Sequence, residues 1–157
     1  MGCGCRGRVL ARELIAGGHV VRGTTRFEAG RAAIAAAGAE PRVGGPDRIG
    51  TLTPALDAVT IVCWLLGIAH AEPDVAAALH GSRLRSLCEK LVDTAVRGLV
   101  YEAGGTLDPE LLAGGAAIVR DVHQTWEIPL RVVYADPGEH VVWLRAMRNA
   151  VTSLLDP

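Results

Sequence analysis

Hydrophobic residues follow two different spacings along this chain. Short, nearly continuous apolar or β-branched runs alternate with longer stretches in which apolar residues recur every three or four positions. A short apolar run is typical of a strand buried on both faces, and the longer period is typical of an amphipathic helix. The short runs predict strands over residues 20–26, 39–43, 57–66, 98–102 and 129–134.

The periodic stretches lie before, between and after these runs. Ser82 is the predicted N-cap of one helix, and the pairs Asp108-Pro109 and Asp136-Pro137 predict the starts of the last two. The other predicted helices cover residues 8–16, 27–37, 52–56, 73–80 and 82–96. Because strands and helices alternate throughout, we expect one α/β domain, residues 1–157, with a doubly wound parallel sheet and helices on both faces.

Three glycines precede the first predicted helix. Gly2, Gly4 and Gly7 fit the spacing G-x-G-x-x-G. The first glycine allows a tight turn, the second lets the backbone approach a pyrophosphate, and the third permits close helix packing. The helix N-terminus supplies free N–H groups and a positive dipole end, and Arg6 can add charge. The pattern therefore predicts a dinucleotide-binding turn.

The strand that follows this helix ends in Thr25-Arg26. A site for NAD usually has an acidic residue there for the ribose 2′-hydroxyl, whereas an arginine suits a 2′-phosphate. The sequence therefore favours NADP over NAD as the cofactor. The alternative is that Arg26 is an ordinary exposed charge.

The fingerprint should follow a buried strand in the centre of the sheet, yet Met1 directly precedes Gly2. We expect that the start lies further upstream, that the chain is truncated, or that the fold lacks its middle strand. A sheet without that strand would have two unpaired edges and a groove in its core.

Composition excludes several classes of function. A net charge of -1 gives no preference for nucleic acid or a membrane surface, and no apolar run approaches the ~20 residues of a membrane span. The opening has no signal-peptide core, so we expect a cytoplasmic protein. Cys3, Cys5, Cys63 and Cys88 lack metal-ligand spacing, which predicts free thiols and no metal site. A single lysine, Lys90, among many arginines resembles proteins from GC-rich bacterial genomes.

The chain resembles the NAD(P)-binding Rossmann domain of the short-chain dehydrogenase/reductase superfamily, in its extended and atypical, NAD-dependent epimerase/dehydratase-like branch. The resemblance rests on the three glycines, Gly18-His19-x-Val21, Thr25-Arg26, and the apolar strand that runs to Gly67. It implies a Rossmann-like fold with its first strand absent or truncated. The cofactor-binding residues that it implies, together with the loop, are Gly2, Cys3, Gly4, Cys5, Arg6, Gly7, Thr25, Arg26, Asp47, Leu65, Leu66 and Gly67.

The catalytic pair of that superfamily is not found. Its reaction needs a tyrosine with a lysine four residues later, but Tyr101 is followed by Gly105 and Tyr134 by Gly138. The catalytic residues therefore stay unknown. Glu102, at the carboxyl end of a predicted core strand, is a candidate pocket residue; the alternative is an exposed loop acid.

Two histidines and two tryptophans are weaker candidates for a functional site. His123 and His140 are expected to be surface or capping residues, and Trp143 to lie in the core. Trp64 is expected in the core as well, with the wall of a ligand pocket as the alternative. In the resembling superfamily the apolar helices often form a dimer interface, which implies a homodimer.

Three functions remain open from the sequence. The first is an NADP-preferring oxidoreductase or epimerase-like enzyme that acts on a small-molecule substrate without the standard catalytic pair. The second is a non-catalytic dinucleotide sensor, or a scaffold that acts through protein contacts. The third is that the loop binds nothing because the strand before it is missing. The fold does not decide between them.

Overall fold

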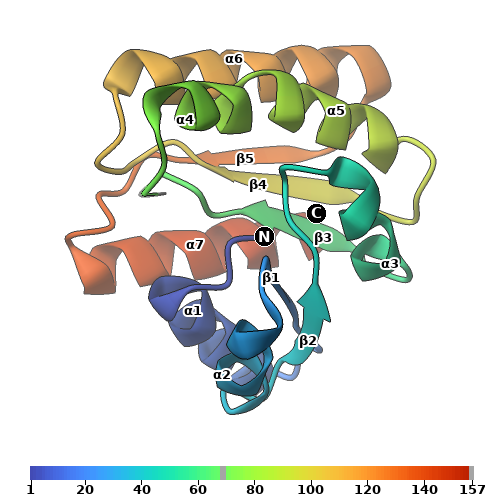
Figure 1. Cartoon of the computed structure of the whole chain (residues 1–157), viewed down its shortest axis with the longest axis vertical. Helices are drawn as coiled ribbons and strands as arrows, with labels where there is room; N and C mark the ends of the chain where they lie inside the picture. The colour runs from blue at the N-terminus through green and yellow to red at the C-terminus, as the bar shows by residue number, and fades with distance from the viewer. Residues whose placement is uncertain (68–69, 156–157) are drawn as a thin grey trace.

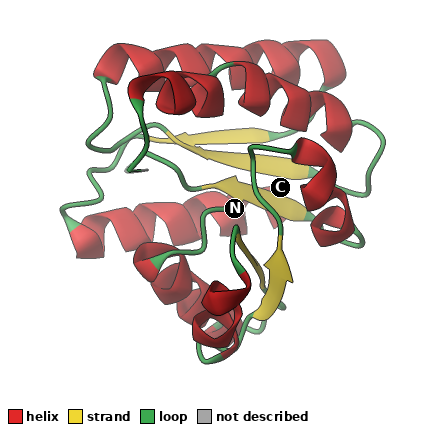
Figure 2. Ribbon diagram, viewed as in Figure 1, coloured by secondary structure: helices red, strands yellow, loops and turns green. Residues whose placement is uncertain are grey.

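A computed structural model describes residues 1–67 and 70–155 of the chain. All strand pairs in it are parallel, as the alternation of strands and helices predicts. Figures 1 and 2 show two separate groups of strands with helices packed around them. The strands are β1 (Arg22–Thr25), β2 (Glu40–Val43), β3 (Ile61–Trp64), β4 (Gly98–Glu102) and β5 (Leu130–Val133).

Helices connect successive strands, and two short 3₁₀ turns, η1 (Glu28–Gly30) and η2 (Ile49–Leu52), precede α2 and α3. The predicted helix over residues 73–80 has the predicted bounds. The α-helices are α1 (Cys5–Ala16), α2 (Arg31–Ala35), α3 (Thr53–Leu56), α4 (Pro73–His80), α5 (Ser82–Leu91), α6 (Pro109–Trp126) and α7 (His140–Leu155).

The sheet β3-β4-β5 is the central layer of the molecule. In Figure 1, α4, α5 and α6 lie on one side of it and α7 and α1 on the other. Successive residues of β4 alternate between the two cores: Leu99 and Tyr101 pack with the α4–α6 cluster, and Val100 packs with Trp143 in the α1–α7 cluster. Every residue of β4 is buried, as its continuous apolar run predicts.

The strands form two sheets, β1-β2 and β3-β4-β5, rather than one continuous sheet. Figure 1 marks the N-terminus between β1 and β3. There the Met1 backbone bonds to β3 through Cys63 and Leu65, and Cys3 N–H donates to the Thr24 carbonyl of β1 at 3.3 Å. The first residues thus join the two sheets at one end only. The predicted α/β class with helices on both faces is confirmed. Among the described strands, β1 pairs with β2 alone and β3 with β4 alone.

Several predicted boundaries were wrong. The helix predicted from residue 82 does start at Ser82, but Ser82 is not its N-cap, because Gly81 occupies that position. That helix ends at Leu91 rather than at residue 96, because the Thr94 hydroxyl bonds back to the Leu91 carbonyl. Asp136 does not cap α7: its carboxylate accepts from Gly138 N–H in a turn, and the helix starts at His140.

Other predicted elements are shorter or divided. The helix over residues 27–37 is split into η1 and α2 at Gly30. The strand over residues 57–66 is confined to Ile61–Trp64, because Ala58 has a left-handed φ of 54° that interrupts the extended backbone before it.

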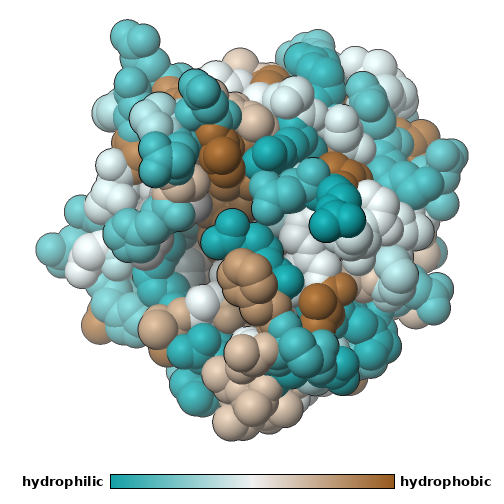
Figure 3. Space-filling view, in the orientation of Figure 1, coloured by the Kyte–Doolittle hydropathy of each residue, from teal (hydrophilic) through white to brown (hydrophobic). Residues whose placement is uncertain are grey.

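The surface in Figure 3 is mostly hydrophilic, with small separate hydrophobic patches on the visible face. Among the large hydrophobic residues, Val20 and Val141 are the most exposed, at 95% and 76%. In the part of the chain that the structure describes, no helix has the length and apolar character needed to cross a membrane.

Candidate functional site

A cavity of about 490 Å³ lies at the carboxyl ends of β1 and β3. Open α/β sheets bind ligands at this edge, and the volume is within the usual range for ligand pockets. The glycine-rich loop, the end of β1 and the segment after β3 form its walls. Every predicted cofactor residue lines it except Gly67: Gly2, Cys3, Gly4, Cys5, Arg6, Gly7, Thr25, Arg26, Asp47, Leu65 and Leu66.

The glycine-rich loop has the backbone that its sequence predicts. Gly2 has a φ of +81°, which only glycine adopts easily, and a Cβ at Gly7 would lie 2.9 Å from the Gly2 carbonyl oxygen. These two glycines are therefore needed by the loop itself. At Gly4, in contrast, a Cβ would have no atom of the protein within 4 Å. The packing of the protein does not require a glycine at position 4. The lack of a side chain there leaves the adjoining part of the cavity open.

The first turn of α1 lines this cavity, and its N–H groups lack the helical acceptors that later turns have. The first helical hydrogen bond is donated by Arg8 N–H to the Gly4 carbonyl at 3.0 Å. The N–H groups of Cys5, Arg6 and Gly7 therefore have no acceptor within the helix. Together with the positive end of the helix dipole, they favour a negatively charged group in the cavity.

Arg6 is fixed by a buried carboxylate. Its Nη1 donates to Glu102 Oε1 at 2.8 Å, and its guanidinium stacks over the Trp143 ring at 4.9 Å from the centroid. Glu102 is fully buried and also accepts from Trp143 Nε1 and Gly67 N–H, each at 2.8 Å. The alternative of an exposed loop acid is therefore wrong. Glu102 lies behind the cavity wall and holds Arg6, rather than lining the cavity.

Gly67 also has a structural role, because it supports the Glu102 carboxylate and packs at the end of the sheet. Its N–H bonds to Glu102, and a Cβ at Gly67 would lie 2.2 Å from the Gly104 carbonyl oxygen. The residue thus packs between two loops at the end of the sheet. It lies outside the lining of the cavity.

Arg26 lines the cavity from the turn that follows β1. Its side chain is 54% exposed, stacks over Phe27 at 5.5 Å, and has Nη1 at 3.9 Å from Asp47 Oδ2. Thr25 Oγ1 accepts from Phe27 N–H and so fixes the turn that presents Arg26. Asp47 also pairs with Arg83 at 2.7 Å. The contact of Arg26 with Asp47 is long and solvated, and such contacts contribute little, so the guanidinium can pair with a ligand anion.

The remaining sequence candidates lie away from the cavity. Trp64 and Trp143 are fully buried in the core, which excludes Trp64 as a pocket wall. His140 starts α7, and His123 Nδ1 lies 2.8 Å from the Ile128 carbonyl oxygen beyond the end of α6. Both histidines therefore have the structural positions that the sequence predicts.

A buried polar pair on the α4–α6 side was missed by the sequence reasoning. His80 Nδ1 lies 2.6 Å from the Tyr101 hydroxyl, which donates to the Leu112 carbonyl at 3.2 Å. Burial lowers the pKa of His80 and raises that of Tyr101. A histidine at the end of an otherwise apolar helix gives no signal that separates it from a surface residue, because its partner is distant in sequence.

The cysteines are all free thiols, as predicted. Burial raises the pKa of Cys63 to about 11 and that of Cys88 to about 12, so both are protonated near neutral pH. Among the described residues no group of histidine, cysteine and acidic side chains is arranged to hold a metal ion.

No protein-family model and no curated protein sequence matches this chain. Solved structures share its architecture. The protein gox2253 superposes with a TM-score of 0.69 at 20% identity, over 83% of this chain and 48% of that one. A triphenylmethane reductase from Citrobacter sp., complexed with NADP(H), gives a TM-score of 0.63 at 19% identity, over 83% and 46%. A UDP-glucuronic acid 4-epimerase variant from Bacillus cereus, complexed with NAD, gives 0.65 at 12% identity, over 83% and 53%.

The fold is Rossmann-like. At these identities the similarity concerns the fold, and the same fold hosts many functions. The chain spans about half the length of each of these three proteins. Their substrates and activities are properties of the longer chains.

Proposed function

We propose that this chain binds a nicotinamide dinucleotide in the cavity at the carboxyl ends of β1 and β3, with NADP preferred over NAD. The observation that carries the proposal is the first turn of α1, where free N–H groups and the open side of Gly4 meet in one cavity. The Citrobacter reductase and the Bacillus epimerase, which share this fold, were solved with NADP(H) and NAD respectively.

Different residues of the cavity lining would hold different parts of the dinucleotide. The N–H groups of Cys5, Arg6 and Gly7 would bind the pyrophosphate, and Arg26 would bind the adenosine 2′-phosphate. Leu65 and Leu66, on the segment after β3, would contact the rest of the cofactor. When bound, the nicotinamide would supply hydride transfer, as in a reductase or epimerase.

Titration calorimetry with NADPH and NADH tests this assignment on the whole chain and on Arg26→Asp. A charge-assisted contact contributes about 1.5–3 kcal/mol, so the substitution should weaken NADPH about 10- to 100-fold and leave NADH nearly unchanged. Arg12→Ala is the control, because Arg12 is exposed on α1 outside the cavity. Equal losses for both nucleotides would contradict the role of Arg26. Binding of neither nucleotide by the unmodified chain would contradict the proposed function.

A dinucleotide sensor without turnover is the second candidate function. The position of Tyr101 favours it: the side chain is fully buried and its hydroxyl lies between His80 and the Leu112 carbonyl. A tyrosine in that position cannot reach a substrate in the cavity as a general acid. NADPH oxidation measured with a panel of carbonyl and quinone acceptors separates the two functions, since turnover above background would contradict the sensor.

A further inference from the structure

An acidic side chain lies between two arginines at one part of the dinucleotide cavity. Asp47 Oδ1 is 2.7 Å from Arg83 Nη1, and Asp47 Oδ2 is 3.9 Å from Arg26 Nη1. Asp47 and Arg26 line the cavity, whereas Arg83, the second residue of α5, contacts Asp47 from outside the lining. Two positive charges and one negative charge therefore meet where the turn after β1 faces the cavity.

The backbone around Asp47 is held in place by the loop that follows β2. Thr51 Oγ1 accepts from Gly45 N–H at 3.0 Å and donates to the Arg48 carbonyl at 2.7 Å. Gly45 also packs against Arg26, because a Cβ at Gly45 would lie 2.8 Å from Arg26 Cγ. The loop thus keeps Asp47 beside Arg26, and the side chains alone decide which arginine the Asp47 carboxylate contacts.

The two ion pairs of Asp47 differ in length and in their exposure to solvent. The Arg83 side chain is 26% exposed and its Nη1 is screened from water, whereas Arg26 is about half exposed. The Arg83 contact is an ion pair rather than an aligned hydrogen bond, so it depends on the two charges. Attraction between charges weakens with distance and with exposure to water, so Arg83 binds the Asp47 carboxylate more strongly than Arg26 does.

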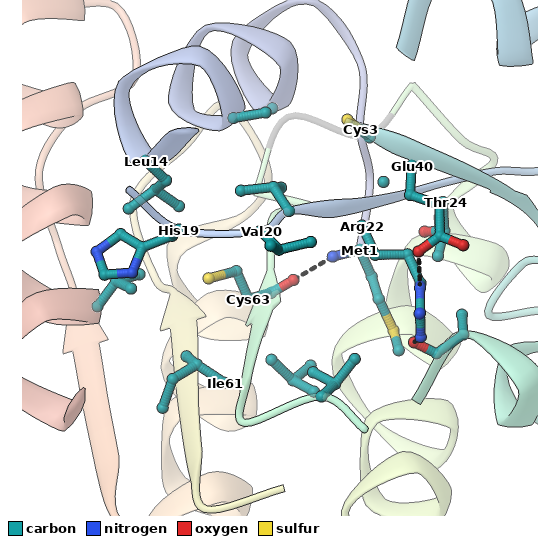
Figure 4. A pocket seen from close by; sticks show the side chains of 18 of the residues that line it. Met1, Cys3, Leu14, His19, Val20, Arg22, Thr24, Glu40, Ile61 and Cys63 are labelled. Carbon is teal, nitrogen blue, oxygen red and sulfur yellow. Dashed lines mark hydrogen bonds and ion pairs between the residues drawn. The ribbon is translucent and has the colours of Figure 1, made fainter. Parts of the chain in front are cut away.

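Arg22, at the start of β1, shows how an arginine of the same strand looks when its own acceptors occupy it. Its Nε donates to Glu40 Oε2 at 2.9 Å, and its Nη1 donates to two backbone carbonyls in and just after α3, at 3.1 and 2.7 Å. Figure 4 shows Arg22 and Glu40 in the wall of a second cavity, between the two sheets. Arg26 differs from Arg22 because the carboxylate nearest to it is held by Arg83.

The partner of Asp47 matters for a phosphate bound at Arg26. A phosphate monoester carries about two negative charges near neutral pH. A carboxylate released from Arg83 would be free to close the 3.9 Å gap to Arg26, where it would neutralise the guanidinium and repel the phosphate. The same carboxylate would not repel a ribose 2′-hydroxyl, because the hydroxyl is uncharged.

We propose that Arg83 is a specificity-determining residue of the dinucleotide site: it holds the Asp47 carboxylate and thereby leaves Arg26 available to a 2′-phosphate. The inference rests on the proposed function and adds to it a residue of α5 that does not line the cavity. Arg83 is a positioning residue, because it acts on the ligand through Asp47. Loss of Arg83 lowers the preference for NADP over NAD and leaves the rest of the site intact.

Titration calorimetry of the whole chain with NADPH and NADH tests the proposal in three variants: Arg83→Gln, Asp47→Asn and the double substitution. Arg83→Gln should weaken NADPH binding about 5- to 20-fold and should not weaken NADH binding. In the Asp47→Asn background, the same substitution should change NADPH affinity by less than about 2-fold, because no carboxylate is left to be released. An arginine that contacted the phosphate itself would cause the same loss in both backgrounds.

Arg85→Gln is the matched control. Arg85 lies on the same helix, pairs with Asp121 at 3.4 Å, and is outside the cavity lining. It should leave both affinities within about 2-fold of the parent. Thermal unfolding shows whether each variant keeps its fold. Asp47→Asn alone tests the proposal without any change at Arg83, since it should bind NADPH at least as tightly as the parent.

Equal losses of NADPH affinity from Arg83→Gln in the two backgrounds would overturn the proposal, because Arg83 would then act independently of Asp47. Unchanged NADPH affinity in Arg83→Gln, or weaker NADPH binding in Asp47→Asn, would overturn it as well. A parent chain that binds neither nucleotide would contradict the proposed function together with this inference. A preference for NADPH that is lost in Arg26→Asp and kept in Arg83→Gln would contradict this inference alone.

Discussion

The Glu102 carboxylate lies 2.8 Å from the Arg6 guanidinium and joins the end of β4 to the first turn of α1 across 96 residues of sequence. Glu102 is fully buried and each of its oxygens accepts at least one other hydrogen bond, from Trp143 or Gly67. A buried carboxylate is tolerated when charged and neutral donors surround it in this way. The pair therefore fixes the glycine-rich loop against the sheet that carries the cavity.

Glu102→Gln should destabilise the protein. In the glutamine side chain, an NH₂ group would replace one acceptor oxygen and would face an N–H donor. Arg6 would also lose its counter-charge. We expect the free energy of unfolding to fall by about 2–4 kcal/mol, measured by urea denaturation. Glu89→Gln, on the exposed side of α5, is the control and should change it by less than about 0.5 kcal/mol. A loss at Glu102 no larger than that of the control would contradict the role assigned to this pair.

Gly4→Val should abolish dinucleotide binding while the fold is kept. A side chain at Gly4 meets no atom of the protein within 4 Å, but it would occupy the space where a pyrophosphate approaches the N–H groups of α1. We expect an unchanged Tm and a loss of NADPH affinity of at least about 100-fold. Gly50→Val, where the space is equally open but lies outside the cavity, is the control. Unchanged affinity in Gly4→Val would mean that the loop is not a phosphate site.

Alanine substitutions at two neighbouring glycines of α6, Gly114 and Gly115, should change the stability of the protein in opposite directions. A Cβ at Gly115 would lie 2.0 Å from the Tyr101 hydroxyl, whereas a Cβ at Gly114 would have nothing within 4 Å. Gly115→Ala should therefore cost about 1–3 kcal/mol of stability by overpacking. Gly114→Ala should add about 0.5–1 kcal/mol through helix propensity. Thermal unfolding of the two variants checks both signs, and a neutral Gly115→Ala would show that Tyr101 can move aside.

Stability should decrease in mild acid because of His80. Burial lowers the pKa of this histidine below its ordinary value of 6.5, so below pH 6.5 the unfolded chain binds a proton that the folded chain does not. The contribution of His80 to the free energy of unfolding should therefore fall as the pH decreases from 6.5 toward the folded pKa, and stay constant above 6.5. In His80→Gln this part of the pH profile should be flatter, measured by urea denaturation between pH 5 and 8. The exposed His140→Gln should keep the slope of the parent, and the same slope in His80→Gln would contradict the assignment.

Local signals in the sequence were sufficient for the loop and for most elements. The spacing of Gly2, Gly4 and Gly7 predicted a tight turn at a helix N-terminus, because φ > 0 at Gly2 and the contact at Gly7 are set within seven residues. The apolar run Gly98–Glu102 and the proline at the start of Pro73–His80 gave bounds that the structure reproduces. A weaker local signal failed at Asp136, whose carboxylate accepts from Gly138 N–H in a turn, so that α7 starts only at His140.

Patterns within short stretches of the chain were therefore enough to predict the alternation of strands and helices, the parallel strand pairing that follows from it, and the residues of the glycine-rich loop. The three-dimensional contacts were needed to show that Glu102 is buried with Arg6 and Trp143, and that His80 meets Tyr101. The difference follows from the separation of the interacting residues along the chain. A turn or a cap depends on residues a few positions apart, whereas a buried charge or a strand edge is settled by partners that the fold brings together from distant segments.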